Sequence, residues 1–431
     1  MRRSLIVVSR RRYIATASVL LLLAATAHAQ PQRLSFAEAM RKAFTRNPDA
    51  LVAQEEISRA RALVEQVRSA SLPTVTAAAT FTQLDSARVS QVTPGNVIVP
   101  ATGFNGAGIA ALTLDPRRWV AWSQARENVN VARLGAADVR RQLGITVGQI
   151  YLSVLAQRQL VEADASAVKN AAAHVEYTRA RLDAGNGTLL DFERATALYN
   201  SDRTLLERAQ FLLVRLQEQL GILLGESAPV DVTTEVALPA APVDESAALD
   251  DARRLRSDLH LQRERLTAAA KVRRESWADF LPSASASFEV FYQTPPTQSL
   301  PTDGWQLLVT VGVPIYDGGL RYGLLKERRA LEREARIRLD AELRLVSADV
   351  RTALVELSRA RTALGTAREA ARISTDVVRL TTVSYHAGLS TNIEVIDAQL
   401  AALNADVAAA LAENDERQAQ LDLLLATGRF P

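Results

Sequence analysis

Hydrophobic residues recur at every seventh position over two long stretches of the chain, 117–183 and 320–386. The first series is Val147, Val154, Val161, Val168, Val175 and Leu182. The second series, 203 positions later, is Val350, Leu357, Leu364, Ala371, Val378 and Tyr385. Neither stretch contains proline, so each predicts one continuous helix, which at the α-helical rise per residue is roughly 100 Å long.

A second series of inward-facing positions in the first long stretch is small or polar. Its members are Gln157, Asp164, Ala171 and Thr178. A simple two-stranded coiled coil would place large apolar residues there. The pattern therefore favours long helices that pack side by side and keep one side in solvent.

Shorter helical segments flank the long ones. A helical region is expected over 35–70, beginning at a capping box of Ser35 and Glu38 and broken at Asn47-Pro48. Composition predicts further helices over 189–224, 248–278 and 392–427. The proline-containing segment 226–247 is expected to form an equatorial connector.

Two other segments, 74–114 and 283–316, change from helical periodicity to alternation and predict β-hairpins. In the first, apolar Val75 and Phe81 alternate with threonines, and in the second Val309 and Val311 belong to a similar series. Strands of about ten residues suit a tilted crossing of an outer membrane. Four tryptophans at or near the strand ends are candidate membrane-interface anchors: Trp119, Trp122, Trp277 and Trp305. A half-buried sheet in a soluble protein is the alternative interpretation.

The chain contains two copies of this plan. Leu72-Pro73 recurs 209 positions later as Leu281-Pro282, and Ala184-Gly185 recurs 203 positions later as Ala387-Gly388. We therefore expect a first repeat over 30–225 and a second over 248–431. Four strands cannot close a barrel alone, and open sheet edges are not tolerated in lipid, so the sequence predicts an oligomer that shares one barrel. The fold class is mainly α with a transmembrane β-barrel.

Charge and composition restrict the possible functions. The chain has 51 basic and 48 acidic residues, and five arginines fall within residues 1–29, which contain no acid. That segment predicts a signal peptide ending at Ala27-His28-Ala29, and hence export to the periplasm or beyond. There is no cysteine, and the sequence has four histidines. We expect no metal, no cofactor, no catalytic residues and no nucleic-acid partner.

Two motifs resemble those of the outer membrane efflux (TolC-like) family. The stretch Tyr385–Gln399, YHAGLSTNIEVIDAQ, is similar to the family's Y-x-A-G-x-x-x-x-x-D-V-L-D-A-Q signature, with Glu394 and Ile396 in place of Asp and Leu. Val313–Gly319, VPIYDGG, resembles the family's strand-to-helix junction. The resemblance implies a homotrimer in the outer membrane of a Gram-negative bacterium, in which a 12-stranded β-barrel continues into a long periplasmic α-helical barrel.

Such a trimer would be an exit duct and not an enzyme. It would receive substrates from an inner-membrane pump through a periplasmic adaptor protein, while outer-membrane lipid surrounds its barrel. A periplasmic adaptor with coiled-coil hairpins is the main alternative, and a periplasmic enzyme is a distant third. Drug efflux and protein secretion are not distinguished by the sequence.

The resemblance also suggests functional residues at the two helical turns. Adaptor docking is expected at Gly185, Asn186, Gly187, Thr188, Gly388, Leu389, Ser390 and Thr391. A periplasmic aperture or gate is expected from Asp191, Arg194, Tyr385, Glu394 and Asp397. In three-fold symmetry Glu394 and Asp397 would form carboxylate rings that favour cations. The simpler interpretations are that the glycines only reverse the helices and that the acids only begin a helix.

Overall fold

The computed structural model describes residues 33–90, 97–234, 236, 238–240, 242, 244–296 and 301–430. The predicted signal peptide, 1–29, lies outside these ranges. The chain divides into two compact units, each assembled from separated stretches. Unit 1 comprises 1–42, 147–237 and 367–414, and unit 2 comprises 43–146, 238–366 and 415–431. The long helices α4 (Pro116–Asp183) and α8 (Leu320–His386) each contribute to both units.

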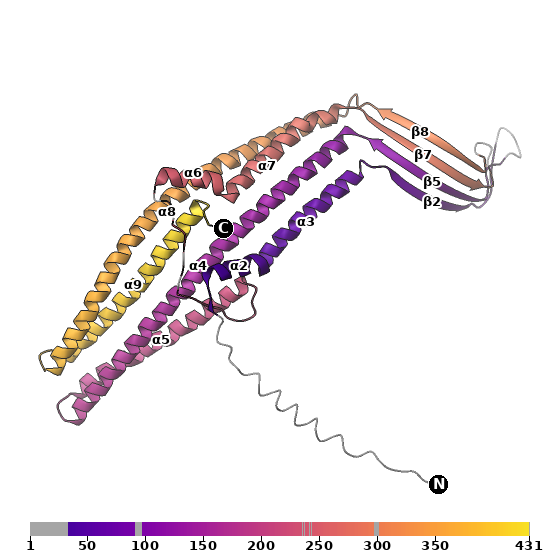
Figure 1. Ribbon diagram of the computed structural model, residues 1–431. Helices are drawn as coiled ribbons and strands as arrows, with labels where there is room; N and C mark the ends of the chain where they lie inside the picture. The colour runs from indigo at the N-terminus through magenta and orange to yellow at the C-terminus, as the bar shows by residue number, and fades with distance from the viewer. Residues whose placement is uncertain are drawn as a thin grey trace, which may run out of the picture. The chain divides into compact units, whose positions relative to one another are not determined.

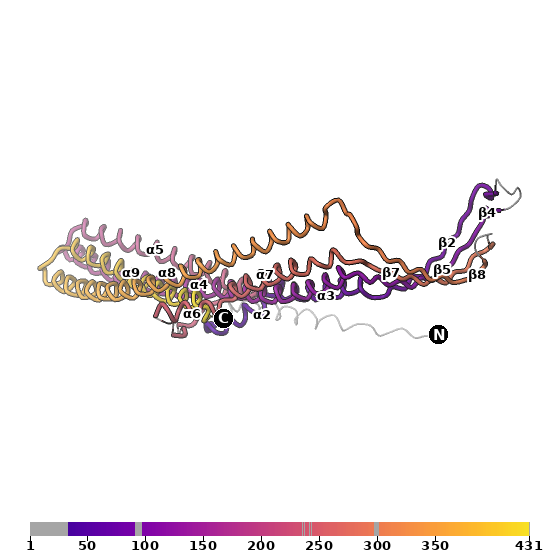
Figure 2. Tube along the Cα trace, turned by 90° about the horizontal axis from the view of Figure 1, so that it is seen from above, coloured from indigo at the N-terminus to yellow at the C-terminus, as the bar shows by residue number. Residues whose placement is uncertain are grey.

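Unit 1 contains two helical hairpins. Helix α4 turns into α5 (Leu189–Leu223), and α8 turns into α9 (Asn392–Ala426). Both views show the two hairpins side by side at their turns (Figures 1 and 2). A short parallel pair of β1 (Arg33–Leu34) and β6 (Asp231–Val232) packs near Tyr151, a fully buried residue whose hydroxyl donates to the carbonyl of Leu34 at 3.0 Å.

The predicted capping box and helix break are confirmed. The Ser35 amide donates to Glu38 Oε2 at 3.1 Å, which begins α2 (Phe36–Arg46). Asn47 then caps α3 (Pro48–Ser69), accepting from the Asp49 amide at 2.8 Å. Proline suits this first helical position because it has no amide hydrogen to leave unpaired.

The continuous helix expected over 248–278 is wrong. Unit 2 instead has α6 (Glu245–Leu255), α7 (Ser257–Arg274) and the 3₁₀ turn η1 (Glu275–Phe280). Arg256, at φ −67° and ψ 123°, interrupts the helix in an extended conformation. Its guanidinium is buried against the carboxylates of Asp258, two residues along the chain, and of Asp349 in α8, so buried ion pairs hold this break rather than a proline or glycine.

A four-stranded antiparallel sheet belongs to unit 2, in the order β2-β5-β7-β8 (Figure 1). Its strands are β2 (Thr74–Gln83), β5 (Thr102–Leu114), β7 (Ser283–Thr294) and β8 (Asp303–Gly312). The strands lie within the hairpins expected over 74–114 and 283–316, but β8 ends before Val313 and Ile315. A separate short pair joins β3 (Arg88–Val89) to β4 (Val97–Val99).

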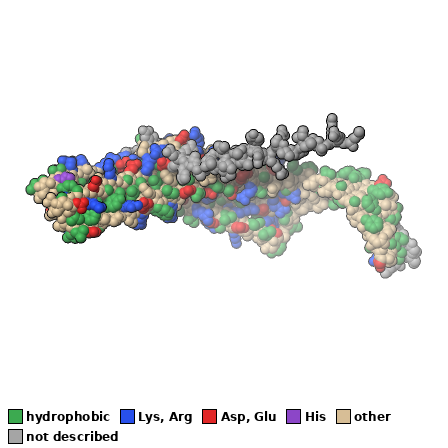
Figure 3. All heavy atoms as spheres, turned by 90° about the horizontal axis from the view of Figure 1, so that it is seen from below, with side chains coloured by type: hydrophobic (Ala, Val, Ile, Leu, Met, Phe, Trp, Pro, Cys, Tyr) green, Lys and Arg blue, Asp and Glu red, His purple; other side chains and the backbone are tan. Residues whose placement is uncertain are grey.

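The register of the sheet places apolar residues on one face across all four strands. Val75 pairs with Ala110, Ala110 with Phe288, and Phe288 with Leu307. The other face is mixed: it carries Thr, Ser, Gln and Glu side chains, including Glu289 opposite Gln306, together with Ile109, Phe291 and Leu308. Val75 is 81% exposed and Val311 65% exposed, so this chain does not cover the apolar face. The space-filling view shows few charged side chains on the sheet and many on the helices (Figure 3).

Unit 2 has its hydrophobic core where α6, α7, α8 and α9 meet. The core includes the predicted heptad residues Val350 and Leu357, which are 0% and 4% exposed. Ala248, Ala252 and Leu423 pack in the same cluster. Small residues on α6 allow the helices to approach closely, and the heptad residues fill the space between them.

Helix α9 is long and apolar enough to cross a membrane by length and composition, with a mean hydropathy of 1.4 over its most apolar window. It forms a hairpin with α8, and 17% of this apolar stretch is buried within the chain, while Leu423 and Leu424 near the end of the helix are fully buried. Much of its apolar character comes from alanine, which favours the helix and permits close packing.

Candidate functional site

The two helical turns of unit 1 have the same hydrogen-bonded geometry. After α4, the Gly185 amide donates to Leu182 O at 3.0 Å and the Asn186 amide donates to Arg181 O at 2.9 Å. After α8, the Gly388 amide donates to Tyr385 O at 3.1 Å and the Leu389 amide donates to Ser384 O at 2.8 Å. Both glycines have positive φ, so each turn is a Schellman motif that requires a left-handed residue.

The acidic residues after the turns begin their own helices. Thr188 Oγ1 accepts from the Asp191 amide at 3.1 Å and donates to Asp191 Oδ2 at 2.7 Å. Glu394 Oε2 accepts from the Thr391 amide at 3.1 Å. Both of these predicted gate carboxylates therefore already have partners within one chain: Glu394 accepts from an amide at a helix N-terminus, and Asp191 accepts from the hydroxyl of the capping residue Thr188.

A buried amide links the two hairpins. Asn392, at the start of α9, places its Oδ1 atom 2.7 Å from Nε2 of His174 in α4. Its Nδ2 group donates to the main-chain carbonyl of Asp191 in α5 at 3.2 Å. Asn392 is 4% exposed and His174 6% exposed. One side chain thus ties three helices together.

An aromatic cluster surrounds this link. Tyr385 is 5% exposed, and its ring centroid lies 5.7 Å from that of His174 and 5.6 Å from that of Tyr177. The Arg181 guanidinium lies 5.1 Å from the centre of the Tyr385 ring. The ring centroids of His386 and Tyr177 are 4.2 Å apart. Burial raises the pKa of Tyr385, so this hydroxyl stays neutral at physiological pH.

Burial also shifts the pKa of His174. It lowers the pKa below the ordinary value of 6.5, and the nearby His386 acts in the same direction. The hydrogen bond with Asn392 and the charge of Asp191 oppose this effect but do not overcome it. His174 is therefore neutral in the arrangement that the structure shows.

The remaining predicted gate residues lie on the surface of the chain. Glu394, Asp397 and Arg194 are exposed. Across the described ranges Arg194 forms no ion pair, so it does not pair with Asp191 or another gate carboxylate within one chain. Leu389 is 82% exposed at the second turn, whereas Ser390 donates to Thr381 O at 3.2 Å.

Four residues of this region were missed by sequence reasoning: His174, Tyr177, Arg181 and Asn392. His174 had a usable signal, because histidine is rare in this chain and Thr178, four residues later, belongs to the polar inward-facing series. Asn392 had a weaker one, as a polar residue in the first turn of a helix. Their contact joins positions 218 residues apart, which no local pattern specifies.

The four tryptophans lie near the sheet but in different surroundings. Trp119 and Trp122 are in the first turns of α4, Trp277 is in η1 and Trp305 is in β8. Trp119, Trp277 and Trp305 are 49%, 55% and 68% exposed. Trp122 instead has two guanidinium groups over its ring, with Arg126 at 4.8 Å and Arg68 at 5.6 Å from the ring centre.

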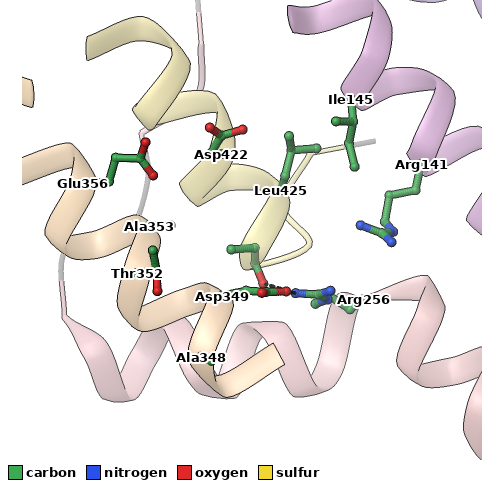
Figure 4. Close-up of a pocket in the computed structure, with 11 residues that line it drawn as sticks. Arg141, Ile145, Arg256, Ala348, Asp349, Thr352, Ala353, Glu356, Asp422 and Leu425 are labelled. Carbon is green, nitrogen blue, oxygen red and sulfur yellow. Dashed lines mark hydrogen bonds and ion pairs between the residues drawn. The ribbon is translucent and has the colours of Figure 1, made fainter. Parts of the chain in front are cut away.

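Unit 2 also has a polar cavity of about 340 Å³. Figure 4 shows Arg141 on one side, Glu356 and Asp422 on the other, and the ion pair of Arg256 with Asp349 below. Opposite charges face one another here, so no single charge is concentrated. Within the described part of the chain, no group of three or more His, Asp or Glu residues could hold a metal ion.

A smaller cavity in unit 1 holds uncompensated carboxyl groups. It is lined by Asp202 of α5, by Gln399 and Asp406 of α9, and by residues of α4 and α8. Asp202 is 5% exposed, and nearby Asp164 is 9% exposed. Burial raises the pKa of both aspartates, and the charge of Asp164 raises that of Asp202 further. Neither carboxyl has a cationic partner among the residues described.

Long paired helices, a four-stranded sheet with an uncovered apolar face and hydrogen-bonded helical turns are the architecture that the sequence motifs implied for an outer-membrane efflux protein. Residues 39–226 and 248–429 match the model of the outer membrane efflux protein family. The chain belongs to this family, as its sequence motifs predicted. Members of the family are outer-membrane channels and not enzymes, which favours the channel over the adaptor alternative.

Individual relatives agree with this assignment. The outer membrane efflux protein BepC of Brucella suis is 26% identical over 343 residues, which span 77% of this chain and 74% of BepC. A membrane protein from Pseudomonas aeruginosa has a TM-score of 0.80 at 21% identity, covering 92% of this chain and 91% of that one. The CmeC outer membrane channel of Campylobacter jejuni has a TM-score of 0.79 at 16% identity, covering 91% and 85%. These structural likenesses establish the fold.

Proposed function

We propose that three copies of this chain form an exit duct across the outer membrane. The duct passively conducts substrates that an inner-membrane pump delivers through a periplasmic adaptor. The apolar face of the sheet supports this proposal most directly. It runs across four strands and is uncovered in the chain, while the polar side chains of the strands gather on the opposite face, as expected for strands between lipid and a watery channel.

The edges of the sheet support sharing of the barrel between chains. Strands β2 and β8 lie at the ends of the strand order, so each has one side without a pairing strand in this sheet. Exposed backbone hydrogen-bonding groups are too costly in lipid. If β8 of one copy pairs with β2 of the next, three copies give a closed barrel of 12 strands. The same ring would continue as 12 helices in the periplasm.

The turns 184–188 and 387–391 are the proposed adaptor-docking surface. Leu389 in the second turn is 82% exposed, and Leu189, which directly follows the first turn, is 61% exposed; large apolar side chains in such positions suit a protein contact. Glu394 and Asp397 would form the acidic aperture, with Asp191, Tyr385 and Arg194 nearby. Trp119, Trp277 and Trp305 are the proposed membrane-interface anchors, while Trp122 has its ring covered by arginines.

Two measurements on the purified protein test the proposed duct: its molecular mass in detergent and its conductance in a planar bilayer. The full protein, purified in detergent, should have the mass of a trimer and should form small, cation-selective channels in a planar bilayer. A monomer that remains in water without detergent and never conducts would overturn the proposal. Substitution of Leu389, an 82% exposed side chain in the second turn, by aspartate should abolish export in cells while trimers remain in the membrane. Loss of the trimer in that variant would assign Leu389 to folding instead of docking.

A further inference from the structure

The contact between His174 and Asn392 lies where the two hairpins of one chain meet. Its atoms define a unique pattern of hydrogen bonds. The main-chain carbonyl of Asp191 can only accept, so the Nδ2 group of Asn392 must face it. Oδ1 of Asn392 therefore faces His174, and Nε2 of His174 must carry the hydrogen that Oδ1 accepts.

Water has little access to this contact. His174 is 6% exposed, Asn392 4%, Tyr385 5% and Thr178 2%. An imidazolium formed here would lose most of its hydration, and the neutral amide of Asn392 supplies no opposite charge. The buried contact between His174 and Asn392 therefore favours the neutral imidazole. We call the arrangement that contains this contact the closed state.

The charged and titratable groups around His174 come from each neighbouring element. Helix α5 contributes the Asp191 carboxylate, which favours the imidazolium. Helix α8 contributes His386, which disfavours it, and neutral Tyr385. Helix α9 contributes neutral Asn392, and α4 itself adds Tyr177 and the Arg181 guanidinium, which faces Tyr385. The charge of the Asp191 carboxylate does not offset the hydration that an imidazolium at His174 would lose on burial.

We propose that the His174–Asn392 contact is a proton-controlled latch, which holds the two hairpins together at neutral pH and releases them on acidification. This inference rests on the proposed duct, because release at the turns would loosen its periplasmic end. Asn392 is the only side chain we find, within the described residues, that hydrogen-bonds to both α4 and α5 from α9. When the hydrogen bond between Asn392 and His174 breaks, the start of α9 is no longer held against α4.

The direction of the pH effect follows from proton binding. The closed state binds a proton on His174 less readily than an open, hydrated state does. The stability of the closed state is therefore complete above the ordinary histidine pKa of 6.5 and is lost as the pH falls below it. One proton can shift the opening equilibrium by at most about tenfold per pH unit.

Single-channel recording across a pH series tests the latch. The open probability of the wild-type trimer should rise several-fold between about pH 7 and pH 5.5, within the limit of one proton. His174→Gln keeps a donor for Asn392 but cannot titrate, so its open probability should not respond to acid in this range. His386→Gln is the matched control, because it removes the exposed neighbouring histidine and should retain the response. Asn392→Ala should open at neutral pH.

Several results would overturn the latch. A wild-type open probability that does not change with pH would do so, as would an acid response that persists in His174→Gln. Channels that conduct but ignore pH would reject the latch and leave the duct intact, whereas no conductance in any variant would reject the duct. If His174→Gln fails to form trimers, carbon-13 NMR of labelled histidines in the wild-type protein gives a second test. One histidine, assigned with His386→Gln and His260→Gln, must then titrate below 6.5.

Discussion

Gly185 and Gly388 lie 203 residues apart and share one backbone conformation, with φ of 72° and 76°. Each ends a long helix through the same pair of hydrogen bonds. Gly225 and Gly428, again 203 residues apart, end α5 and α9 in the same manner with φ of 69° and 71°. The recurrence of one geometry at one spacing supports the inference that the chain arose from an internal duplication.

Gly388→Ala should destabilise the protein through its backbone alone. A Cβ atom at Gly388 meets no other atom within 4 Å, yet a left-handed alanine costs about 1 kcal/mol. We expect the thermal midpoint, followed by circular dichroism in detergent, to fall by a few degrees. Gly365→Ala is the matched control in the interior of α8, where a Cβ atom is equally unobstructed and alanine favours the helix. Its midpoint should not fall.

The carboxylates that follow the second turn should determine ion selectivity. The double substitution Glu394→Gln with Asp397→Asn removes two exposed charges from each copy without changing side-chain size. Reversal potentials in a salt gradient should move toward zero, because the aperture no longer concentrates cations. Glu55→Gln, which removes an exposed charge on α3, should leave the potential unchanged. An equal shift of the reversal potential in the double variant and in Glu55→Gln would show that Glu394 and Asp397 do not form an acidic ring at the aperture.

Arg256 should be essential for the stability of unit 2. Its Nε and terminal nitrogens donate to Asp258 at 3.1 Å and 2.6 Å, and it also donates to Asp349 at 3.0 Å. Arg256→Met leaves the buried Asp258 with one cationic partner, Arg141 at 3.2 Å, and with the Leu259 amide at 2.8 Å, and should cost about 3 kcal/mol in denaturant unfolding. Adding Asp258→Leu should recover much of the loss, because the carboxylate that lost its main partner is then removed. No recovery would argue against charge burial as the cause.

The same ion pair predicts a dependence on acid. Burial by itself would raise the pKa of Asp258, but the hydrogen bonds and charge of Arg256, with the charge of Arg141, lower it below the ordinary 3.8. A carboxyl with a lowered pKa contributes stability above its unfolded value, and this contribution is lost as the pH falls through the folded value. The stability advantage of the wild type over the Arg256→Met, Asp258→Leu variant should therefore shrink below about pH 4.

The stability contributed by Asp202 should depend on pH in the opposite direction from that contributed by Asp258, and Asp202→Asn tests this. Burial raises the pKa of Asp202, so the folded protein binds a proton more tightly than the unfolded chain does. Its contribution is most favourable below the ordinary Asp pKa of 3.8 and declines as the pH rises toward the folded value. At neutral pH the variant should melt at a higher temperature than the wild type, and the difference should vanish in acid. Asp340→Asn, on the exposed face of α8, should leave the melting temperature unchanged both at neutral pH and in acid.

Brominated lipids should distinguish the tryptophans. Fluorescence from Trp119, Trp277 and Trp305 should be quenched, because these exposed rings lie near the ends of the apolar sheet. Trp122 should resist quenching, because Arg68 and Arg126 cover its ring. Variants that retain one tryptophan each, with phenylalanine at the other three positions, allow the comparison. Strong quenching of Trp122 would place it among the lipid anchors.

The sequence by itself determined the local features of this protein. A heptad period and the absence of proline predicted the extent of α4 and α8, since helical packing repeats along one chain. Ser35, Glu38 and Asn47-Pro48 predicted where helices begin and break, because capping involves residues a few positions apart. Alternation predicted which strand residues share a face, and the YHAGLSTNIEVIDAQ motif identified the family.

Only the tertiary structure decided the interactions between distant segments. The break at Arg256 was missed because arginine has good helix propensity, and burial with Asp258 and Asp349 outweighs that preference. The link between His174 and Asn392 was missed because it exists only when two hairpins lie side by side. Local periodicity records which face of a helix is buried, but not which residue of another helix faces it. Charge, hydrogen bonding and proton affinity at these contacts depend on that partner, and the fold alone supplies it.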